Sequence, residues 1–351
     1  MKKGALILKY ETIFLNEERN VTLTSFILPV GGEFRNVPAR PAILILPGGG
    51  YGMCSDREAE PVAMSYLAAG YDAFILRYSV NQHRQWPNPL DDYEQAMTYI
   101  REHAKKWHIL PDKIAVIGFS AGGHLAAAAA TMAKNRPNAA ILGYAVVTED
   151  VLGCNDTAPD TVSQVDLQTP PCFLFHARCD GTVPVENSLR FMTALAQKGI
   201  TFESHIYGFG PHGFSKGDSA LEIPRKDFCS RIPDWVADSI GFLKDVFGDF
   251  GPDGLEEPRC KHFINGNFEP MLSGECTLIK LSSIPEAAQA IRGVISKAMS
   301  FDGSKSTLES MTSQFPHMMF CDICNFSLAT SEEKQTALDT LAQIPNPDYE
   351  V

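Results

Sequence analysis

Short apolar runs alternate with longer amphipathic stretches along most of the chain. From residue 42 onward such runs recur at 42–46, 73–76, 114–117, 140–147, 172–175 and 202–207, and several of them are continuously apolar. Strands that are buried on both faces, as in parallel sheets, show this pattern, whereas strands with one face in water alternate. Helical patterns separate the runs, at about 55–70, 91–107, 121–133, 185–197 and 233–246. This order predicts an α/β fold with a doubly wound, mostly parallel sheet.

The first part of the chain has a different pattern. The runs at 13–15 and 21–28 alternate more, and no helical pattern separates them. We expect two antiparallel strands at one edge of the sheet. The first helix is expected to begin near Ser55, because Ser55 and Glu58 have the spacing of a capping box, and to stop at Gly70.

A change of composition at residues 248–258 indicates a domain boundary. Glycine, proline and acidic residues dominate there, which is typical of a linker. We therefore expect a first module at 1–248, a linker at 249–258 and a small, mostly helical accessory segment at 259–351. Two capping-box pairs precede apolar stripes in that segment, Ser283 with Glu286 and Thr330 with Glu333. The sequence assigns no role to it.

Charge limits the classes of partner. The 351 residues include 30 Lys and Arg against 42 Asp and Glu, a net charge of −12, which opposes binding to nucleic acid or to an anionic membrane surface. No apolar run approaches the ~20 residues that span a bilayer. The nine cysteines are scattered, as is typical of reduced thiols in the cytoplasm. We expect a cytoplasmic protein with an uncharged small-molecule partner, and a homo-oligomer remains open.

The pattern G-x-S-x-G follows directly after the strand at 114–117, as Gly118-Phe119-Ser120-Ala121-Gly122. An alanine-rich helix comes next. In this context a tight strand-to-helix turn lifts the serine hydroxyl out of the sheet. Small residues are needed because the turn is strained and backbone approaches closely. Ser120 is the candidate nucleophile; the alternative is a glycine-rich turn with a capping serine.

A run of three glycines follows the strand at 42–46. Gly48, Gly49 and Gly50 stand between Pro47 and Tyr51, where backbone N–H groups can surround a developing oxyanion. We expect the N–H groups of Gly49 and Gly50, together with that of Ala121, to form the oxyanion hole. A phosphate-binding loop is the competing interpretation, but no G-K-[ST] sequence follows.

An acid and a histidine complete the candidate constellation. Asp180 follows the strand at 172–175, and His212 follows the strand at 202–207 in a Gly-Pro-His-Gly loop. Both stand at carboxyl ends of strands, where open α/β sheets place their sites, and their order after Ser120 suits a Ser–acid–His triad. Glu149 and Asp150, after the preceding strand, are the fallback acids.

These motifs resemble the esterase/lipase branch of the α/β-hydrolase superfamily, in particular compact bacterial acetylesterases, including acetyl xylan esterase-like members. The resemblance rests on 43–51 (ILILPGGGY), 118–126 (GFSAGGHLA), 183–188 (VPVENS) and 210–213 (GPHG), and covers about 20–247. It implies an α/β-hydrolase fold with Ser120 as nucleophile, His212 as base and then acid, and Asp180 orienting the imidazole. In relatives of hormone-sensitive lipase a histidine usually stands where this chain has Pro47, so any role of that histidine in bracing the loop is absent here.

The expected activity is that of a serine carboxylesterase without cofactor or metal. Only about two dozen residues separate the strand at 140–147 from the next one, too few for a large helical lid, which favours a small acyl group such as acetyl. Tyr51 and Trp86 are candidate aromatic walls for the alcohol. The partner would be a small ester or an acetylated oligosaccharide.

Two other functions stay open on the sequence alone. The same triad hydrolyses amides, so a serine peptidase or amidase is an alternative, and so is a catalytically silent binding scaffold.

Cys321 and Cys324 have the C-x-x-C spacing of a zinc site, but no second pair matches them, so we expect buried thiols and no metal.

Overall fold

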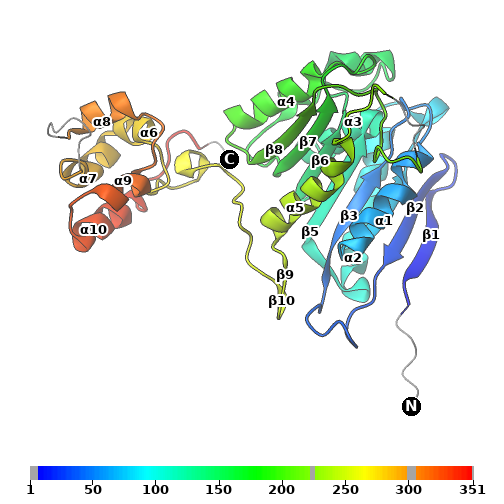
Figure 1. Cartoon of the computed structure of the whole chain (residues 1–351), viewed down its shortest axis with the longest axis horizontal. Helices are drawn as coiled ribbons and strands as arrows, with labels where there is room; N and C mark the ends of the chain where they lie inside the picture. The colour runs from blue at the N-terminus through cyan, green and yellow to red at the C-terminus, as the bar shows by residue number, and fades with distance from the viewer. Residues whose placement is uncertain (1–6, 222–225, 299–305, 350–351) are drawn as a thin grey trace. The chain divides into compact units, whose positions relative to one another are not determined.

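The computed structural model describes residues 7–221, 226–298 and 306–349, and divides them into two compact units, Met1–His262 and Phe263–Val351. The first unit is built on a sheet of eight strands in the order β1-β2-β4-β3-β5-β6-β7-β8 (Figure 1). The strands are β1 (Lys9–Asn16), β2 (Val21–Ile27), β3 (Arg40–Leu46), β4 (Asp72–Arg77), β5 (Ile109–Phe119), β6 (Ala139–Gly143), β7 (Cys172–Ala177) and β8 (Phe202–Tyr207).

The strand directions follow the expected pattern. β1 pairs antiparallel with β2, and β2 pairs antiparallel with β4 at the edge of the sheet. All other neighbours, from β4 through β8, are parallel. The strands β3 and β6 are fully buried, as their continuous apolar character predicts. The α/β fold with a doubly wound, mostly parallel sheet is confirmed.

Five helices cover the sheet: α1 (Glu60–Ala68), α2 (Asn88–Trp107), α3 (Ser120–Thr131), α4 (Glu186–Gln197) and α5 (Trp235–Phe247). After β3 the chain moves to β4, and after β4 it moves the other way, through β5 to β8. Because crossover connections are right-handed, this reversal places α1 on one face and α2, α3 and α4 on the other. The apolar core between α1, α5 and the sheet includes Tyr66, Phe175 and Trp235.

The reversal also creates a natural place for a site. β3 and β5 are neighbours, yet their following connections run toward opposite edges of the sheet. In open α/β sheets a crevice forms at the carboxyl ends of such a pair. The glycine loop follows β3 and Ser120 follows β5, so the fold brings the two motifs together at this point.

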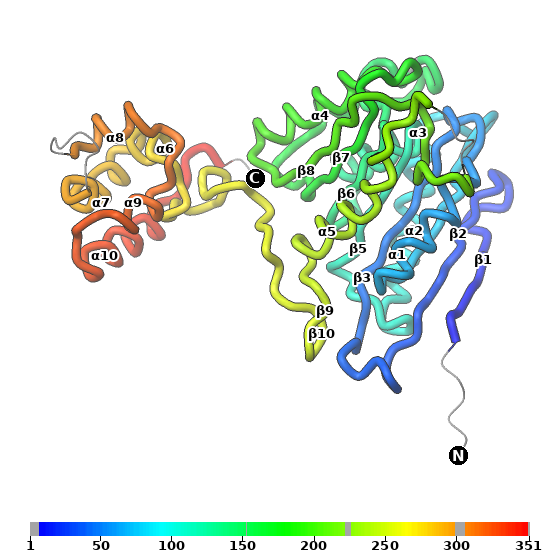
Figure 2. The backbone as a smooth tube through the Cα atoms, in the orientation of Figure 1, coloured from blue at the N-terminus to red at the C-terminus, as the bar shows by residue number. Residues whose placement is uncertain are grey.

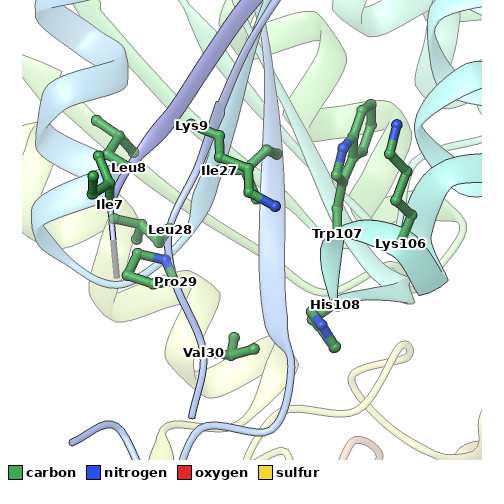
Figure 3. A pocket seen from close by; sticks show the side chains of 10 residues that line it. All are labelled: Ile7, Leu8, Lys9, Ile27, Leu28, Pro29, Val30, Lys106, Trp107 and His108. Carbon is green, nitrogen blue, oxygen red and sulfur yellow. The ribbon is translucent and has the colours of Figure 1, made fainter. Parts of the chain in front are cut away.

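A cavity of about 380 Å³ lies at the other edge of the sheet (Figure 3). Trp107 and His108, which line it, directly precede β5, so it is at the amino ends of the parallel strands. Its other lining residues are largely apolar: Ile7, Leu8, Lys9, Ile27, Leu28, Pro29, Val30 and Lys106. The cavity is therefore remote from the strand ends that carry Ser120.

The segment expected to be a linker has structure of its own. Residues at 249–258 include a short antiparallel pair, β9 (Phe250–Gly251) and β10 (Gly254–Leu255). The N–H of Arg259 donates to Asp245 O at 2.8 Å, and that of Thr201 donates to His262 O at 2.9 Å. These bonds join the segment through His262 to the first unit, and Figure 2 traces the backbone of this segment.

The second unit is helical. It contains α6 (Leu278–Ser283), α7 (Pro285–Ile295), α8 (Leu308–Gln314), α9 (Phe320–Phe326) and α10 (Ser331–Leu341). These helices enclose a separate apolar core that includes Leu281, Ile291 and Phe320. Among the helices that the structure describes in either unit, none has the length and apolar character to cross a membrane.

Candidate active site

Ser120 stands at a sharp turn between β5 and α3. Its φ of 53° lies in the left-handed region, which costs a non-glycine residue about 1–2 kcal/mol. A Cβ on Gly118 would lie 2.1 Å from Gly122 O, and one on Gly122 would lie 2.1 Å from Leu46 O. Only glycine fits at these two positions, and this close packing holds the strained serine in place.

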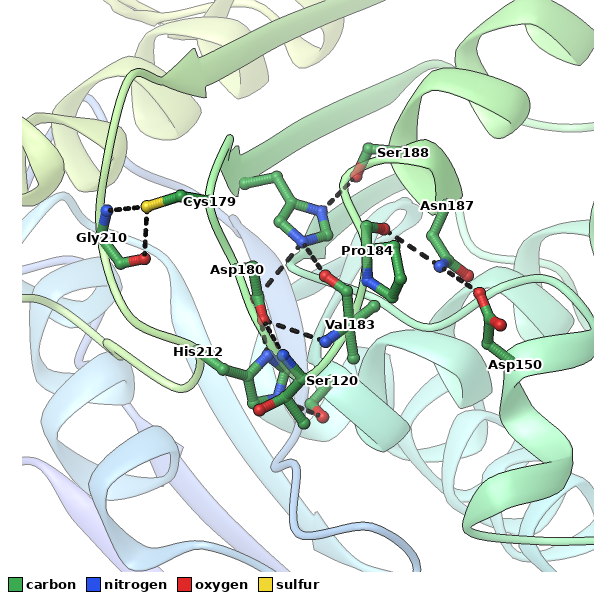
Figure 4. Close-up of polar contacts among 12 residues, drawn as sticks. Ser120, Asp150, Cys179, Asp180, Val183, Pro184, Asn187, Ser188, Gly210 and His212 are labelled. Carbon is green, nitrogen blue, oxygen red and sulfur yellow. Dashed lines mark hydrogen bonds and ion pairs between the residues drawn. The ribbon is translucent and has the colours of Figure 1, made fainter.

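A chain of hydrogen bonds connects Ser120 to His212 and Asp180 (Figure 4). Ser120 Oγ lies 2.9 Å from His212 Nε2, and His212 Nδ1 lies 2.7 Å from Asp180 Oδ2. Because a carboxylate can only accept, Nδ1 carries the hydrogen, and Nε2 is then free to accept the serine hydroxyl. The three residues come from the carboxyl ends of β5, β7 and β8.

Asp180 is held as an anion. Burial by itself raises its pKa, but hydrogen bonds from His176 and His212 outweigh burial and bring the pKa below its usual range. Its other oxygen accepts the N–H groups of Thr182 and Val183, at 2.8 Å and 2.9 Å. A carboxylate that accepts several hydrogen bonds keeps its charge. It can therefore orient the imidazole and stabilise its protonated form.

The glycine loop lies directly against Ser120. A Cβ on Gly48 would lie 3.1 Å from Ser120 Cβ. Gly49 and Gly50 have φ values of 134° and 61°, which suit glycine. Within the described residues, no hydrogen-bond acceptor is found for the N–H of either. Ala121 is in the first turn of α3, where backbone N–H groups lack partners within the helix. These three N–H groups remain the expected oxyanion donors.

Two known protein families match parts of the first unit. The chain matches the BD-FAE family over residues 34–145 and the prolyl oligopeptidase family over residues 157–241. The crystal structure of MGS-M1, an α/β-hydrolase enzyme from a Medee basin deep-sea metagenome library, is 44% identical in sequence. It matches with a TM-score of 0.64, and the match covers 68% of this chain and 98% of that one.

The chain belongs to the α/β-hydrolase family. Two further relatives of this α/β hydrolase have acetyl esters or acetylxylan in their names. The acetyl ester-xyloside bifunctional hydrolase from Caldicellulosiruptor lactoaceticus is 30% identical, with a TM-score of 0.56 and coverage of 67% of this chain and 97% of that one. The acetylxylan esterase from Xylanibacter ruminicola is 33% identical over 205 residues, which are 51% of this chain and 42% of the relative. The α/β hydrolase spans about a third to a half of the length of the first curated relatives it matches.

The fallback acids of the α/β hydrolase have other partners. Asp150 Oδ2 accepts from Asn187 Nδ2 at 2.9 Å (Figure 4), and Glu149 pairs with Arg190 at 3.1 Å. Asp180 is thus the carboxylate that the structure places on His212.

The two expected aromatic walls differ in the structure. Tyr51 is fully buried, and its hydroxyl lies 2.7 Å from His124 Nδ1 on α3. It therefore does not form the exposed aromatic wall for the alcohol that the sequence suggests. Trp86 is half-buried, and its ring centroid lies 5.5 Å from that of His124. Trp86 therefore remains a candidate contact for substrate.

Sequence reasoning missed two buried residues near the site. Glu58 was expected to cap a helix, but its carboxylate turns inward and accepts the N–H of Gly48 at 2.8 Å. Tyr144, expected within a strand, follows β6 with a φ of 34° and donates its hydroxyl to Glu58. The break in regular structure at Tyr144 has no clear signal in the sequence.

A metal site in the second unit finds no support in the described residues. No group of three or more His, Cys, Asp or Glu side chains there has an arrangement that could hold a metal ion. Cys321 and Cys324 both lie on α9, and burial raises the pKa of each thiol.

Proposed function

We propose that this α/β hydrolase is a serine carboxylesterase that hydrolyses esters of short acyl groups, chiefly acetyl. The alcohol part of the ester would carry several hydroxyl groups, as in carbohydrates. The observation that carries the proposal is the hydrogen-bonded chain Ser120–His212–Asp180, at 2.9 Å and 2.7 Å, beside the glycine loop. Its order along the chain and its place at the strand ends are those of a nucleophile, a base and an orienting acid.

The proposed reaction has two halves. His212 Nε2 takes the hydroxyl proton as Ser120 Oγ attacks the ester carbonyl, and the N–H groups of Gly49, Gly50 and Ala121 stabilise the oxyanion. The tetrahedral intermediate collapses, the C–O bond to the alcohol breaks, and His212 returns its proton to the leaving alkoxide. Water then attacks the acyl-enzyme in the same way, which releases the carboxylic acid and restores Ser120.

A small acyl group fits the short connection between β6 and β7. The regular structure described there is limited to two short 3₁₀ turns, Glu149–Gly153 and Val162–Gln164. Long acyl chains need extensive apolar cover, which lids commonly supply. Hydrolysis of aryl esters should therefore be fastest with acetyl and fall toward octanoyl.

A polar groove beside the oxyanion loop supports a hydroxylated alcohol. This polar groove has a volume of about 400 Å³. It is lined by Asn81, Gln82, Arg84, Gln85, Asn155, Asp156 and Thr157. The N–H of Asn81 donates to Tyr51 O at 2.7 Å, and a Cβ on Gly50 would lie 3.9 Å from Cys154 Cβ. Both walls of the groove thus adjoin the glycine loop.

The chemistry of the polar groove suits sugar hydroxyls. Amide, guanidinium and carboxylate groups supply both donors and acceptors. The half-buried Trp86 adjoins them, and its backbone N–H donates to Thr157 Oγ1 at 2.8 Å. The names of two relatives, an acetylxylan esterase and an acetyl ester-xyloside hydrolase, agree with such an alcohol.

The nucleophile is tested by Ser120→Ala. We expect hydrolysis of 4-nitrophenyl acetate and labelling by a fluorophosphonate both to be lost, with thermal unfolding unchanged. Activity that survives Ser120→Ala would contradict the proposed function.

The alcohol is tested by comparing acetylated xylo-oligosaccharides with 4-nitrophenyl acetate. Arg84→Ala and Gln85→Ala should lower kcat/KM for the oligosaccharides about 10-fold, equivalent to about 1.4 kcal/mol, and leave the aryl ester within about 2-fold. Equal effects on both substrates would rule out the polar groove as the alcohol site.

An amidase or peptidase is the second candidate, because residues 157–241 match the prolyl oligopeptidase family. Matched ester and anilide substrates with the same acyl group distinguish the two activities. A larger kcat/KM for the anilide would favour the peptidase.

A further inference from the structure

A buried carboxylate lies between the glycine loop and the loop that carries His212. Glu58 is only 3% exposed. Its Oε2 accepts the N–H of Gly48 at 2.8 Å, and its Oε1 accepts the hydroxyl of Tyr144 at 2.5 Å. Carboxylates are rarely buried to this extent without partners that offset the lost hydration. Burial raises the pKa of Glu58, and these two hydrogen bonds act in the opposite direction.

Tyr144 extends the connection to the histidine loop. Its hydroxyl accepts the N–H of Ser215, three residues after His212, at 3.0 Å. Its ring meets the imidazole of His212 edge to face, with centroids 5.1 Å apart and planes at 71°. Tyr144 thus contacts both the backbone that carries His212 and the imidazole itself.

A second connection joins the same two segments. Ser215 Oγ donates to the backbone oxygen of Arg57, the residue before Glu58, at 2.6 Å. The indole N–H of Trp235 donates to Ser215 O at 2.9 Å. Because Glu58 and Ser215 are tied both through Tyr144 and through Arg57, the two segments cannot shift independently.

Gly48 transmits the position of Glu58 to the nucleophile. A Cβ on Gly48 would lie 2.8 Å from Glu58 Oε2, 2.6 Å from Phe119 O and 3.1 Å from Ser120 Cβ. The Gly48 peptide therefore fills the space between the carboxylate and the serine. Gly49, the next residue, carries the first of the proposed oxyanion donors.

We propose that Glu58 is a positioning residue for the esterase reaction. It fixes the Gly48 amide, and with it the N–H groups of Gly49 and Gly50, relative to His212 by way of Tyr144. The inference rests on the proposed function and assigns Glu58 a part in orienting the oxyanion hole. Together with Tyr78, whose hydroxyl donates to Pro47 O at 2.7 Å, it braces a loop in which Pro47 offers no side-chain hydrogen bond.

The expected loss of activity on substitution of Glu58 depends on how sensitive catalysis is to the geometry of the oxyanion hole. Loss of one oxyanion donor costs about 10²–10³ in turnover, and a displacement of about 1 Å costs up to about 10². Glu58→Ala leaves the Gly48 amide without its acceptor but removes no donor. We therefore expect kcat for 4-nitrophenyl acetate to fall about 10- to 100-fold, with KM within about 3-fold.

Two gentler variants separate positioning from folding. Glu58→Gln keeps a carbonyl oxygen for Gly48, and the Tyr144 hydroxyl can turn to accept from the new amide, so kcat should recover to within about 5-fold of the original. Tyr144→Phe keeps the ring on His212 but removes the hydroxyl that bonds both Glu58 and the Ser215 N–H, and should lower kcat about 5- to 20-fold.

The affinity for an inhibitor that forms a tetrahedral adduct distinguishes a positioning role from a purely structural one, because a purely structural role would leave that affinity unchanged. A trifluoromethyl ketone forms an adduct with the serine whose oxyanion occupies the same hole. Its affinity should fall across the Glu58 and Tyr144 variants by the same factor as kcat/KM. The measurements are made well below the thermal unfolding temperature of each variant.

Tyr66→Phe is the matched control, because it also removes a buried hydroxyl, one that lies 2.9 Å from Ser239 Oγ. It should leave kcat and inhibitor affinity within about 2-fold. The positioning role is overturned if folded Glu58→Ala keeps kcat and inhibitor affinity within 2-fold of the original. If Glu58→Ala does not fold, the test passes to Glu58→Gln and Tyr144→Phe. The positioning role is then overturned if both variants keep kcat and inhibitor affinity within 2-fold of the original, because Tyr144→Phe is expected to lose activity.

The result is distinguishable from failure of the proposed function. An active Ser120→Ala variant contradicts the esterase mechanism as a whole. An inactive Ser120→Ala together with unaffected Glu58 and Tyr144 variants contradicts only the positioning role.

Discussion

Three buried or half-buried histidines of the first unit differ in what their two nitrogens contact. His124 bonds a tyrosine hydroxyl and a backbone oxygen. His176 bonds Ser188 Oγ and a backbone oxygen, and its Nε2 also lies 3.3 Å from Asp180 Oδ2. His212 instead joins the Ser120 hydroxyl to the Asp180 carboxylate. An imidazole between a hydroxyl and an anion is arranged to take up a proton. Of the two histidines that contact Asp180, His212 is the one that bonds the Ser120 hydroxyl and is partly exposed to solvent.

Asp180→Asn tests the orientation of His212. An amide can donate to Nδ1, which favours the tautomer whose Nε2 carries the hydrogen and cannot accept from Ser120. We expect kcat for 4-nitrophenyl acetate to fall by about 10³–10⁴. Asp150→Asn, which alters the fallback acid, is the control and should leave kcat within about 2-fold. The reverse order of effects would assign the role to Asp150.

Asp72 carries a testable link between pH and stability. Burial raises its pKa to about 7, despite a hydrogen bond from the Leu28 N–H and the charge of Arg40. The native state therefore keeps a proton that the unfolded chain releases near pH 4, so this group lowers the free energy of unfolding as pH rises from about 4 to about 7. Its other oxygen, Oδ2, has no hydrogen-bond partner among the described residues.

We expect Asp72→Asn to gain stability relative to the original protein by about 3 kcal/mol between pH 4.5 and pH 8. Urea unfolding at both pH values measures the difference. Exposed Asp112, changed to Asn, should show no such pH-dependent gain. A constant difference at both pH values would show that Asp72 titrates normally.

At the scale of elements, capping-box spacing predicted helix starts with unequal success. Thr330 and Glu333 form the expected capping box at α10. Ser55 makes no side-chain capping bond. The N–H of Ser55 donates to Gly48 O, that of Glu58 donates to the backbone oxygen of Ser55, and the Glu58 carboxylate is engaged by Gly48 and Tyr144. Ser283 instead ends α6, since Pro285 begins α7 and the residue before a proline is disfavoured in helical conformation. Local spacing predicts a cap only where no stronger partner competes.

The turn between β5 and α3 depends on glycine at Gly122, where a Cβ would collide with Leu46 O. We expect Gly122→Ala to separate β3 from the turn, lower stability by at least about 2 kcal/mol and reduce kcat at least 100-fold. Gly153→Ala, where a new Cβ would have open space, is the matched control. Thermal unfolding and 4-nitrophenyl acetate hydrolysis measure both, and an active, stable Gly122→Ala would show that the turn can adapt.

At the scale of the whole molecule, the proposed catalytic residues, the glycine loop and Glu58 all lie in the unit that ends at His262. The second unit has its own apolar core. Each unit thus has the buried apolar surface that a separately folded domain needs.

Two shortened chains test where the first unit ends. A chain ending at His262 should keep kcat/KM for 4-nitrophenyl acetate within about 3-fold. One ending at Gly248 loses the β9–β10 pair and the bonds from Arg259 to Asp245 and from Thr201 to His262, and should unfold at a temperature several degrees lower. Equal thermal stability of the two would place the boundary at 248, as the sequence suggests.

The sequence by itself determined the order of strands and helices, the sharp turn at Ser120 and the candidate residues Asp180 and His212. Each depends on neighbours close along the chain, or on the rule that parallel strands present their carboxyl ends at one edge. The tertiary structure decided the burial of Tyr51, the inward turn of Glu58 and its bond to Tyr144, and the extent of the first unit. Those contacts join residues far apart in sequence, 86 positions in the case of Glu58 and Tyr144. Hydrophobic periodicity does not indicate which distant donor will bond a buried acceptor, so these partners are known only from the packed fold.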